Sequence, residues 1–438
     1  MCAYVAENQQ NQWYIGVRLI RMKKENIYVD LPENVVNIIS KLESDGNQAY
    51  AVGGCVRDSV LKRTPEDWDI TTSAVPQQVK ALFKRTVDTG IKHGTVTIMI
   101  DKSGYEVTTY RIDGDYEDGR HPKSVEFSVC LEDDLKRRDF TINAMAYNNA
   151  TGLVDQFNGI DDLNSKIIRC VGNPTDRFSE DALRMMRAIR FSAQLGFSIE
   201  DQTYAAIKEL AVNINKVSRE RIHVELNKTL LSDHPDYIMM MYETRLTKQI
   251  LPIIDVVLSG RRSVVTLTML KISPKELVLK YAALLNDIPA DKVTETLKDL
   301  KLDNNTIYTV TKLVECSKLV IQEKEPSVRE AIYKYGKDII PLIILHQETI
   351  LMAKEISTGI KMTGGKNHIA VLKRLYQEIM DRGDCISVKD LNVNGSDLME
   401  YGLKGPIIGE TLDELLHIVM ENPKLNEKET LIAMIENR

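Results

Sequence analysis

The chain is 438 residues long and 43% hydrophobic, enough apolar surface for roughly two to four globular domains. Its formal net charge of −6 argues against a general binder of polyanions, although a local basic face could still hold nucleic acid. No apolar run reaches the roughly 18 residues that cross a membrane, and the N-terminus lacks a secretory signal pattern. We therefore expect a cytoplasmic protein without a membrane partner, and no protein partner is evident. Its six cysteines lack C-x-x-C pairing and are expected to be reduced thiols.

Residues 1–21 show no periodic pattern, and we interpret them as an N-terminal extension. Between residues 31 and 160, helical segments alternate with short β-rich runs such as QAYAV, TVTIMI and YEVTTYRI, punctuated by Gly and Asp. This pattern predicts an α+β module built on a small sheet. From about Asp176 the strand signals vanish and apolar residues recur at helical spacing. The remaining two-thirds of the chain is therefore predicted to be mostly helical.

A pair of glycines, Gly53 and Gly54, follows the first predicted strand and opens a helix in the segment AYAVGGCVRD. Because glycine has no side chain, backbone amides at this point can approach a phosphate closely. Arg57 lies in the first turn of the same helix, where its forked guanidinium could bind the same phosphates. The segment is therefore predicted to bind phosphate groups.

Two aspartates in DWDITTS, Asp67 and Asp69, are predicted to begin the next strand. Because side chains alternate along a strand, both carboxylates should point to one face and Trp68 to the other. Such oxygen ligands can hold Mg²⁺, which shares them readily with substrate phosphates. Glu106 in YEVTTYR offers a third acid on a strand expected to lie beside this one. Three carboxylates around two metals would serve nucleotidyl transfer, one metal activating a hydroxyl and the other stabilising the leaving pyrophosphate.

A simpler interpretation of Asp67 and Asp69 remains open from these residues alone. The D-x-D pattern is common at turns between a helix and a strand, where acids accept hydrogen bonds from backbone amides. The glycine pair upstream and the acid on a neighbouring strand favour the metal site, because nucleotidyl transfer needs a phosphate-binding turn as well as carboxylates.

Several motifs, in the same order along the chain, resemble those of one protein family. GGCVRD and DWDITTS are similar to the signature of the DNA polymerase β-like nucleotidyltransferase superfamily. Together with YEVTTYR, RRDFTINAMAYN and EDALRMMRAIRF, they make the chain resemble the bacterial class II CCA-adding enzymes, which are tRNA nucleotidyltransferases. The resemblance runs from about residue 27 to the C-terminus. A departure in the aspartate motif is Trp68, where the family usually has an aliphatic residue, but both aspartates are intact.

The resemblance implies template-independent addition or repair of the 3′-terminal CCA of tRNA from CTP and ATP, with Mg²⁺ as cofactor and release of pyrophosphate. It implies an α+β fold, in which a small mixed or antiparallel sheet forms a nucleotidyltransferase head and an elongated all-α neck, body and tail follow. The body and tail would bind the acceptor arm and 3′ end of tRNA by backbone charge and shape. The corresponding ranges are 22–165 for the head, 166–225 for the nucleotide-selecting neck, 226–335 for the body and 336–438 for the tail.

Further residues take their expected roles from the resemblance. Arg138 would bind the nucleotide, and Asn143 would lie near the ribose, where an amide could distinguish a 2′-hydroxyl from hydrogen; a surface arginine and a helix-capping amide are the alternatives. The glycine-rich, charged segment RIDGDYEDGRHPKSVEFS is expected to be a mobile loop beside the site. In the family such a loop helps to switch specificity from C to A, so its presence, with Asp118, Arg120 and Pro122, favours addition of the full CCA.

The helical segment EDALRMMRAIRF, with Ser179 as its expected N-cap, is the expected site of base selection. A spacing of three residues places Asp181, Arg184, Arg187 and Arg190 along one face. Cytosine and adenine both present an amino donor beside a ring-nitrogen acceptor, which a carboxylate and a guanidinium can match. Uracil and guanine present the inverse and would leave buried polar groups unpaired. The resemblance assigns base reading to Asp181 and Arg184, and phosphate contact or pocket shaping to Arg187 and Arg190; an ordinary Asp–Arg salt bridge on a solvated helix is the alternative.

Rival functions follow from the same fold. A bacterial poly(A) polymerase shares the chemistry, but such enzymes usually carry a basic RRFRLAHV-like segment where this chain has FKRTVDTGIKHGTV. An enzyme that adds only A or only CC is a closer rival. A non-catalytic RNA-binding module with a decayed transferase fold is a rival of another class, and the intact acids Asp67, Asp69 and Glu106 argue against it.

Overall fold

The computed structural model describes residue 22 and residues 27–114, 125–260 and 263–436. The predicted N-terminal extension, residues 1–21, lies outside the described residues. The same is true of the predicted loop residues Asp118, Arg120 and Pro122.

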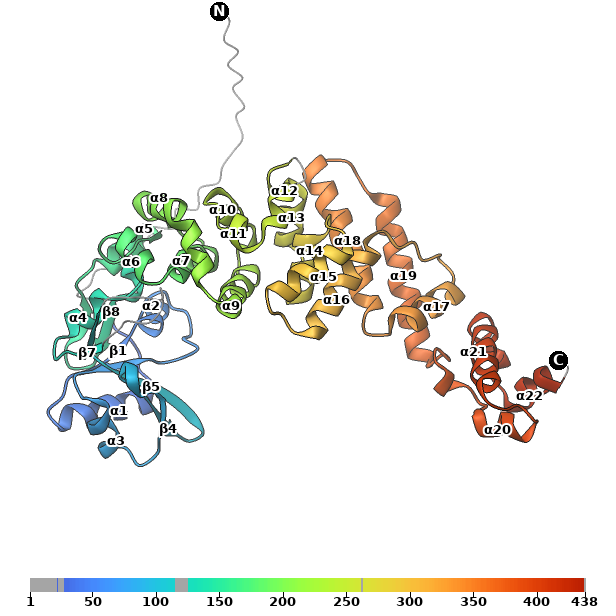
Figure 1. Cartoon of the computed structure of the whole chain (residues 1–438), viewed down its shortest axis with the longest axis horizontal. Helices are drawn as coiled ribbons and strands as arrows, with labels where there is room; N and C mark the ends of the chain where they lie inside the picture. The colour runs from blue at the N-terminus through green and yellow to red at the C-terminus, as the bar shows by residue number, and fades with distance from the viewer. Residues whose placement is uncertain (1–21, 23–26, 115–124, 261–262, 437–438) are drawn as a thin grey trace, which may run out of the picture. The chain divides into compact units, whose positions relative to one another are not determined.

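The chain forms two compact units, of which the first ends at Val171 and the second begins at Gly172 (Figure 1). The first contains a mixed sheet with helices around it, and the second is helical apart from the two-residue strand β11 (Ser198–Ile199). The predicted α+β head followed by a helical remainder is therefore confirmed. Within the described ranges, no helix is long and apolar enough to cross a membrane.

The sheet of the head has seven strands in the order β3-β4-β5-β2-β1-β8-β9. Neighbouring strands are antiparallel except β2 and β5, which are parallel, with Ile70 opposite Val107. This parallel pair places Glu106, which precedes Val107, on the strand beside β2. The strands are β1 (Ala49–Val52), β2 (Ile70–Thr72), β3 (Thr86–Gly90), β4 (Thr95–Ile100), β5 (Ser103–Thr109), β8 (Met145–Asn148) and β9 (Gly152–Asp155).

The helices of the head cover its sheet through apolar side chains at helical spacing. One face of α1 buries Val35, Ile38, Ile39 and Leu42. A second buried cluster joins β1, β8 and α4 through Tyr50, Val52, Tyr110, Leu131, Leu135, Ala144, Ala146 and Val171. The remaining elements are α1 (Glu33–Ser44), α2 (Gly54–Val60), α3 (Pro76–Leu82), α4 (Leu131–Lys136), α5 (Gly159–Ser165), the hairpin β6 (Arg111–Asp113) and β7 (Val125–Phe127), and β10 (Ile167–Ile168).

Strand β2 begins at Ile70, three residues later than predicted. The sequence analysis started it at Asp67, but only residues 70–72 pair along β1. The carbonyl of Asp69 still accepts a hydrogen bond from the amide of Val52 at 2.9 Å, so the chain approaches β1 just before the strand. Asp67 and Trp68 therefore lie in the segment that leads into β2, and strand alternation does not determine their directions.

The second unit consists of helices joined by short turns, as its apolar periodicity predicts. Helix α18 packs against α13, α14 and α16, while α17 packs against α19 and α21. The helices are α6 (Pro174–Glu180), α7 (Leu183–Leu195), α8 (Asp201–Leu210), α9 (Arg219–Leu230), α10 (Ile238–Glu243), α11 (Thr247–Ile250), α12 (Asp255–Leu258), α13 (Ser263–Ile272), α14 (Leu277–Leu285), α15 (Ala290–Asp299), α16 (Asn304–Glu315), α17 (Glu325–Tyr335), α18 (Ile340–Thr358), α19 (Thr363–Arg382), α20 (Gly395–Glu400), α21 (Pro406–Glu421) and α22 (Lys428–Glu436).

The last helices have a buried cluster of their own. It is made by apolar side chains from Cys385 to Ile435, drawn from α20, α21, α22 and the turns between them. The predicted start of the tail at residue 336 stays a prediction, since α18 packs on body helices and this final cluster begins only after α19.

A buried arginine connects α17 to these last helices. Arg329 is 2% exposed, and its Nε donates to Asp384 at 2.7 Å, just after the end of α19. Its Nη1 donates to the carbonyl of Met420 in α21 at 2.8 Å, and its Nη2 donates to Glu325. A charge buried this deeply is stable only while its partners hold it.

We predict that Arg329→Met will weaken the packing of the last helices, because the carbonyl of Met420 would lose a buried donor and Asp384 would keep only the exposed Arg382 as an ion-pair partner. The free energy of opening of residues 385–435, measured by hydrogen exchange, should fall by about 3 kcal/mol. Arg374→Met is the matched control: Arg374 is exposed and lies 4.0 Å from Glu378. Its loss should cost less than about 1 kcal/mol. Equal effects of the two substitutions would contradict the role given to Arg329.

Candidate active site

The turn between β1 and α2 contains the glycine pair. Gly53 has φ +83° and ψ −126°, a conformation that residues with a side chain rarely adopt. An added Cβ would lie 2.8 Å from Nη1 of Arg138, so the position also lacks room for a side chain. The amide of Gly53 donates to the carbonyl of Met145 at 3.1 Å, which ties the turn to β8. The predicted succession of strand, glycine pair and helix is present, with the Gly53 amide engaged inside the protein.

The side chains of Arg57 and Asn143 are hydrogen-bonded to each other. Arg57 is buried, and its Nη1 donates to Oδ1 of Asn143 at 2.6 Å. Its Nε and Nη2 donate to Asp58 at 3.0 and 2.9 Å. Asn143 lies in the 3₁₀ turn η3 (Thr141–Asn143), and its side-chain Nδ2 donates to Oδ1 of Asp139 at 3.0 Å. These contacts join α2 to η3. Arg57 and Asn143 therefore have a structural role, in addition to the role in nucleotide binding that was predicted for them.

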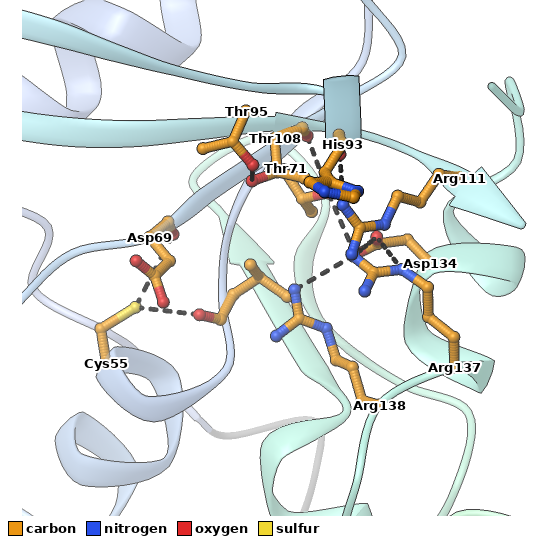
Figure 2. A network of polar contacts seen from close by, with 11 residues as sticks. Cys55, Asp69, Thr71, His93, Thr95, Thr108, Arg111, Asp134, Arg137 and Arg138 are labelled. Atoms are coloured by element: carbon orange, nitrogen blue, oxygen red, sulfur yellow. Dashed lines mark hydrogen bonds and ion pairs between the residues drawn. The ribbon is translucent and has the colours of Figure 1, made fainter. Parts of the chain in front are cut away.

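The segment from Asp67 to Asp69 leads into β2, the middle strand of the seven-stranded sheet. Both aspartates are exposed and Trp68 is half-buried. The carbonyl of Asp69 accepts a weak hydrogen bond from the thiol of Cys55 at 3.9 Å (Figure 2). Burial, and then the charge of Asp69, raise the pKa of the Cys55 thiol to about 11, so the thiol stays neutral beside the aspartate. Nothing in the structure assigns a function to Trp68.

The acids in the head interact electrostatically. Asp69 retains solvent-accessible surface, yet desolvation by the surrounding protein raises the pKa of its carboxyl; the charge of Arg138 opposes this and that of Asp67 adds to it. Burial also raises the pKa of Glu106, and the charges of Asp69 and Asp67 raise it further. The three carboxylates predicted from the sequence are thus close enough to repel one another.

This repulsion fits a site for a cation. Among the described residues, no three His, Cys, Asp or Glu side chains gather closely enough to enclose a metal ion by themselves. An incomplete set of oxygen ligands suits a hard divalent ion that completes its shell with substrate phosphates and water. The donors that this chain offers are therefore consistent with a substrate-shared metal rather than a closed structural site.

Arg138 brings a positive charge to the acidic group. Its charge opposes the rise in the pKa of Asp69 that desolvation causes, and its Nη2 donates to Oδ2 of Asp134 at 3.1 Å. Its Nε is buried and has no hydrogen-bond partner among the described residues. A guanidinium that keeps unused donors beside the Gly53 turn can bind an anionic ligand.

The structure corrects the predicted start of the base-selecting helix. Ser179 does not cap it: the residue lies in the last turn of α6, where its hydroxyl donates to the carbonyl of Thr175 at 2.7 Å. Asn173 accepts a hydrogen bond from the amide of Thr175, and Pro174 occupies the first turn, so a separate helix starts upstream.

Asp181 lies between α6 and α7, in an extended conformation with φ −140° and ψ 104°. Its Oδ1 accepts a hydrogen bond from the amide of Leu183 at 3.0 Å, at the start of α7. Its Oδ2 accepts from Arg221 of α9 at 2.7 Å, while Nη1 of Arg184 donates to Glu180 at 2.6 Å. Asp181 thus precedes α7 instead of sharing its face, and other residues hold both Asp181 and Arg184 in place.

The two later arginines of α7 have different surroundings. Arg190 is 6% exposed; its Nε donates to Glu225 of α9 at 2.5 Å, and its guanidinium lies 3.7 Å from the ring centroid of Phe191. Arg187 is more exposed, with Nη1 3.8 Å from Glu225. These contacts hold Arg190 between α7 and α9, and its implied role in phosphate contact or pocket shaping stays a prediction.

The residues that hold predicted site residues were not predicted from the sequence, and Asp134 and Arg221 are two examples. Asp134 stands four residues before Arg138, a helical ion-pair spacing that is visible in the sequence. Arg221 follows Asp181 by 40 residues, and no local pattern indicates that pairing. The structure therefore adds one contact that spacing could have suggested and one that only the fold reveals.

Family models match the chain in three consecutive parts. The "Poly A polymerase head domain" matches residues 49–169, and the "Probable RNA and SrmB- binding site of polymerase A" matches residues 196–258. "tRNA nucleotidyltransferase domain 2" matches residues 273–435. Together with the mixed sheet and its carboxylates, these matches define the class as a nucleotidyltransferase with a helical RNA-binding region.

Similar proteins narrow the class to a family. A CCA-adding enzyme of Ligilactobacillus salivarius is 38% identical over 90% of this chain and 94% of its own length. One of Leuconostoc mesenteroides is 35% identical over 92% and 96%. The solved structure of the Bacillus stearothermophilus CCA-adding enzyme in complex with CTP superposes with a TM-score of 0.74 at 30% identity, covering 92% of this chain and 96% of that one. This chain belongs to the family of CCA-adding enzymes, nucleotidyltransferases that use divalent metal ions.

We predict that Gly53→Ala will destabilise the head, since the new methyl group would meet Arg138 in a backbone conformation unfavourable to side chains. The free energy of unfolding should fall by about 1–2 kcal/mol, measured by denaturant unfolding. At Gly54 an added Cβ would lie 3.8 Å from Nη2 of Arg57, an ordinary contact. Gly54→Ala should therefore cost less than about 0.5 kcal/mol, and a larger loss there than at Gly53 would contradict this account.

We predict that Glu106→Gln will stabilise the metal-free protein at pH 7, because it removes repulsion from Asp69 and Asp67. The gain should be a few tenths of a kcal/mol, since solvent screens this exposed group. A raised pKa in the folded state means that stability present below the ordinary glutamate pKa of 4.5 is lost as pH rises through the raised value. The advantage of the variant should therefore develop as pH rises from 4.5.

Denaturant unfolding in a metal chelator, at a series of pH values, measures this difference. Glu126→Gln, at an exposed glutamate on β7, is the matched control and should change stability little. Added divalent metal should favour the parent protein over Glu106→Gln. A parent and variant of equal stability at pH 7 without metal would show that the repulsion is negligible.

Proposed function

We propose that this protein adds or repairs the 3′-terminal CCA of tRNA, taking nucleotides from CTP and ATP and releasing pyrophosphate. The observation that carries the proposal is the electrostatic coupling of Asp67, Asp69 and Glu106 on the nucleotidyltransferase head. A structural relative solved with CTP, similar along almost its whole length, supports it. A binding module without catalysis would have no reason to keep three mutually repelling acids. We place the reaction in the cytoplasm, where tRNA is processed.

Mg²⁺ is the metal that we propose for this site, with Asp67 and Asp69 as ligands. When bound, the metal ions would lower the pKa of the attacking 3′-hydroxyl and neutralise charge on the leaving pyrophosphate. Glu106 would complete the ligand set or help to orient that hydroxyl. The exposure of both aspartates supports this assignment, because Mg²⁺ retains waters and substrate oxygens in its shell.

The triphosphate would be bound beside the glycine turn. The uncommitted donors of Arg138 are suited to phosphate oxygens, and the absence of side chains at Gly53 and Gly54 lets the ligand come close to the backbone. Arg57 and Asn143 would contribute from the other side of the turn. Because each now holds the other at 2.6 Å, contact with the ribose or phosphates would require them to exchange that partner for the ligand.

Base selection would fall to Asp181 and Arg184. The contacts with Arg221 and with the amide of Leu183 hold the Asp181 carboxylate in one orientation, and Glu180 holds Arg184 in the same way. Both oxygens of Asp181 keep further acceptor capacity, so the amino group of cytosine or adenine can still donate to it. Uracil and guanine would place a carbonyl against this carboxylate and an N–H against the guanidinium, which costs orders of magnitude in rate.

The remaining residues of the helical unit would support selection and tRNA binding. Arg190, held by Glu225, would keep α7 in place, and the more exposed Arg187 would contact the nucleotide. Residues 22–165 would form the catalytic head and 166–225 the neck. The body (226–335) and tail (336–438) would bind the acceptor arm of tRNA through its backbone charge and A-form shape.

An incorporation assay tests the proposal directly. We expect the protein, given Mg²⁺, all four nucleotides and tRNA that lacks its terminal CCA, to add C, C and A and then stop. Asp69→Asn should lower the rate at least a hundredfold, because a neutral amide is a poor metal ligand. Asp101→Asn is the matched control, at an exposed aspartate in the turn between β4 and β5.

The products separate the proposal from its rivals. A long adenosine tail would indicate a poly(A) polymerase, and products ending after CC, or formed only from tRNA that already carries CC, would indicate a partial enzyme. Absence of incorporation by the parent protein, or full activity of Asp69→Asn, would overturn the proposal.

A further inference from the structure

Helix α4 contributes a fully buried carboxylate to the head, that of Asp134. Its Oδ1 accepts hydrogen bonds from Nε and Nη2 of Arg137 at 3.0 and 2.5 Å. Its Oδ2 accepts from Nη2 of Arg138 and from the hydroxyl of Thr71, each at 3.1 Å (Figure 2). Burial alone would raise the pKa of Asp134, but Arg138 and Arg137 lower it below its usual value. The carboxylate is therefore charged at neutral pH, and its acceptors are all directed at defined partners.

Asp134 connects β2, the strand that follows the aspartates, with the arginine beside the Gly53 turn. Thr71 lies on β2 two residues after Asp69 and is itself fully buried. Arg138 follows the end of α4, which stops at Lys136. Thr71 and Arg138 donate to the same oxygen of Asp134. Asp134 therefore fixes the position of the Arg138 guanidinium relative to β2, the strand that follows Asp69.

The contact with Asp134 uses only part of the Arg138 guanidinium. Nη2 donates to Asp134. Nη1 lies against Gly53, 2.8 Å from the position that a Cβ would take there. Nε is buried and has no hydrogen-bond partner among the described residues. Asp69 is a competing acceptor nearby: its carbonyl accepts from the amide of Val52, the residue before Gly53, and Nη1 of Arg138 lies against Gly53. A guanidinium released from Asp134 would be drawn to Asp69, because a charge-assisted bond to a carboxylate satisfies its unused donors.

We propose that Asp134 is a positioning residue, which holds Arg138 beside the Gly53 turn and keeps it from pairing with Asp69. The role rests on the proposed function, in which Arg138 binds the incoming nucleotide and Asp69 binds metal. It explains why an arginine and a metal-binding carboxylate can be neighbours without neutralising each other. Asp134 thereby keeps one residue free for phosphate and the other free for the cation.

The substitution Asp134→Asn tests this role. It preserves the shape of the side chain but removes the charge and presents an N–H where one arginine donor needs an acceptor. We expect kcat/KM for CTP and for ATP to fall about tenfold, the effect of losing one charged hydrogen bond. The Mg²⁺ concentration for half-maximal rate should rise severalfold, because Arg138 would compete for Asp69, while KM for tRNA should change less than twofold.

Asp162→Asn is the matched control. Asp162 is another buried carboxylate of the head, 6% exposed, and it also accepts from a threonine and an arginine, namely Thr141 at 2.6 Å and Arg169 at 3.1 Å. A merely structural effect would lower the thermal midpoint of both variants and leave the Mg²⁺ requirement of both unchanged. A raised Mg²⁺ requirement in Asp134→Asn alone is the expected result.

A double substitution shows whether Asp134 acts through Arg138. In an Arg138→Ala background, Asp134→Asn should change kcat/KM for CTP less than twofold. If Asp134→Asn fails to fold, Thr71→Val should still raise the Mg²⁺ requirement; it removes the hydroxyl that contacts Asp134 and the carbonyl of Thr108. A full tenfold effect in the Arg138→Ala background, or an unchanged Mg²⁺ requirement in the folded variant, would overturn the positioning role. Failure of the parent protein to incorporate CTP would instead overturn the proposed function.

Discussion

Repulsion between acidic side chains is the constraint on which the rest of the head depends. Desolvation raises the pKa of both Asp69 and Glu106; the charge of Asp67 raises each further, and that of Asp69 adds to the rise at Glu106. Such a group is unfavourable in the empty protein, and proteins retain it where a cation or substrate is to bind. The positive charge of Arg138 must then be near enough to moderate the group and held firmly enough not to neutralise it. The buried contacts of Asp134 meet both requirements.

Local patterns were sufficient to predict much of this arrangement. The strand, glycine pair and helix around Gly53 follow from residue types with strong conformational preferences, and φ +83° at Gly53 shows why glycine is needed. The neighbouring position of Glu106 followed from two β-rich runs that pair side by side. Arg184, Arg187 and Arg190 lie on α7 as their spacing predicts. In each case the information lies within a few residues of the feature.

The rest depends on contacts between distant parts of the chain. Strand β2 starts at Ile70 because its length is set by pairing with β1, which alternation within DWDITTS does not reveal. Asn173 and Pro174 give a stronger start signal and begin a separate helix, α6. That helix ends at Glu180, so Asp181 lies between α6 and α7. The partners Arg221 and Glu225 both come from α9 and hold residues of the preceding segment. No spacing within one helix predicts such pairs, since the fold alone brings them together.

The neutral thiol of Cys55 bears on which ions the head can attract. Sulfur is the donor that draws soft metals such as Zn²⁺ and Cu⁺, but only after it has lost its proton. Burial and the adjacent aspartate keep this proton in place up to about pH 11. The protonated thiol is therefore a poor ligand, and an ion arriving at the proposed site would meet carboxylate oxygens instead. In this way a cysteine directly after the glycine pair leaves the chemistry of the proposed phosphate-binding turn to hard cations.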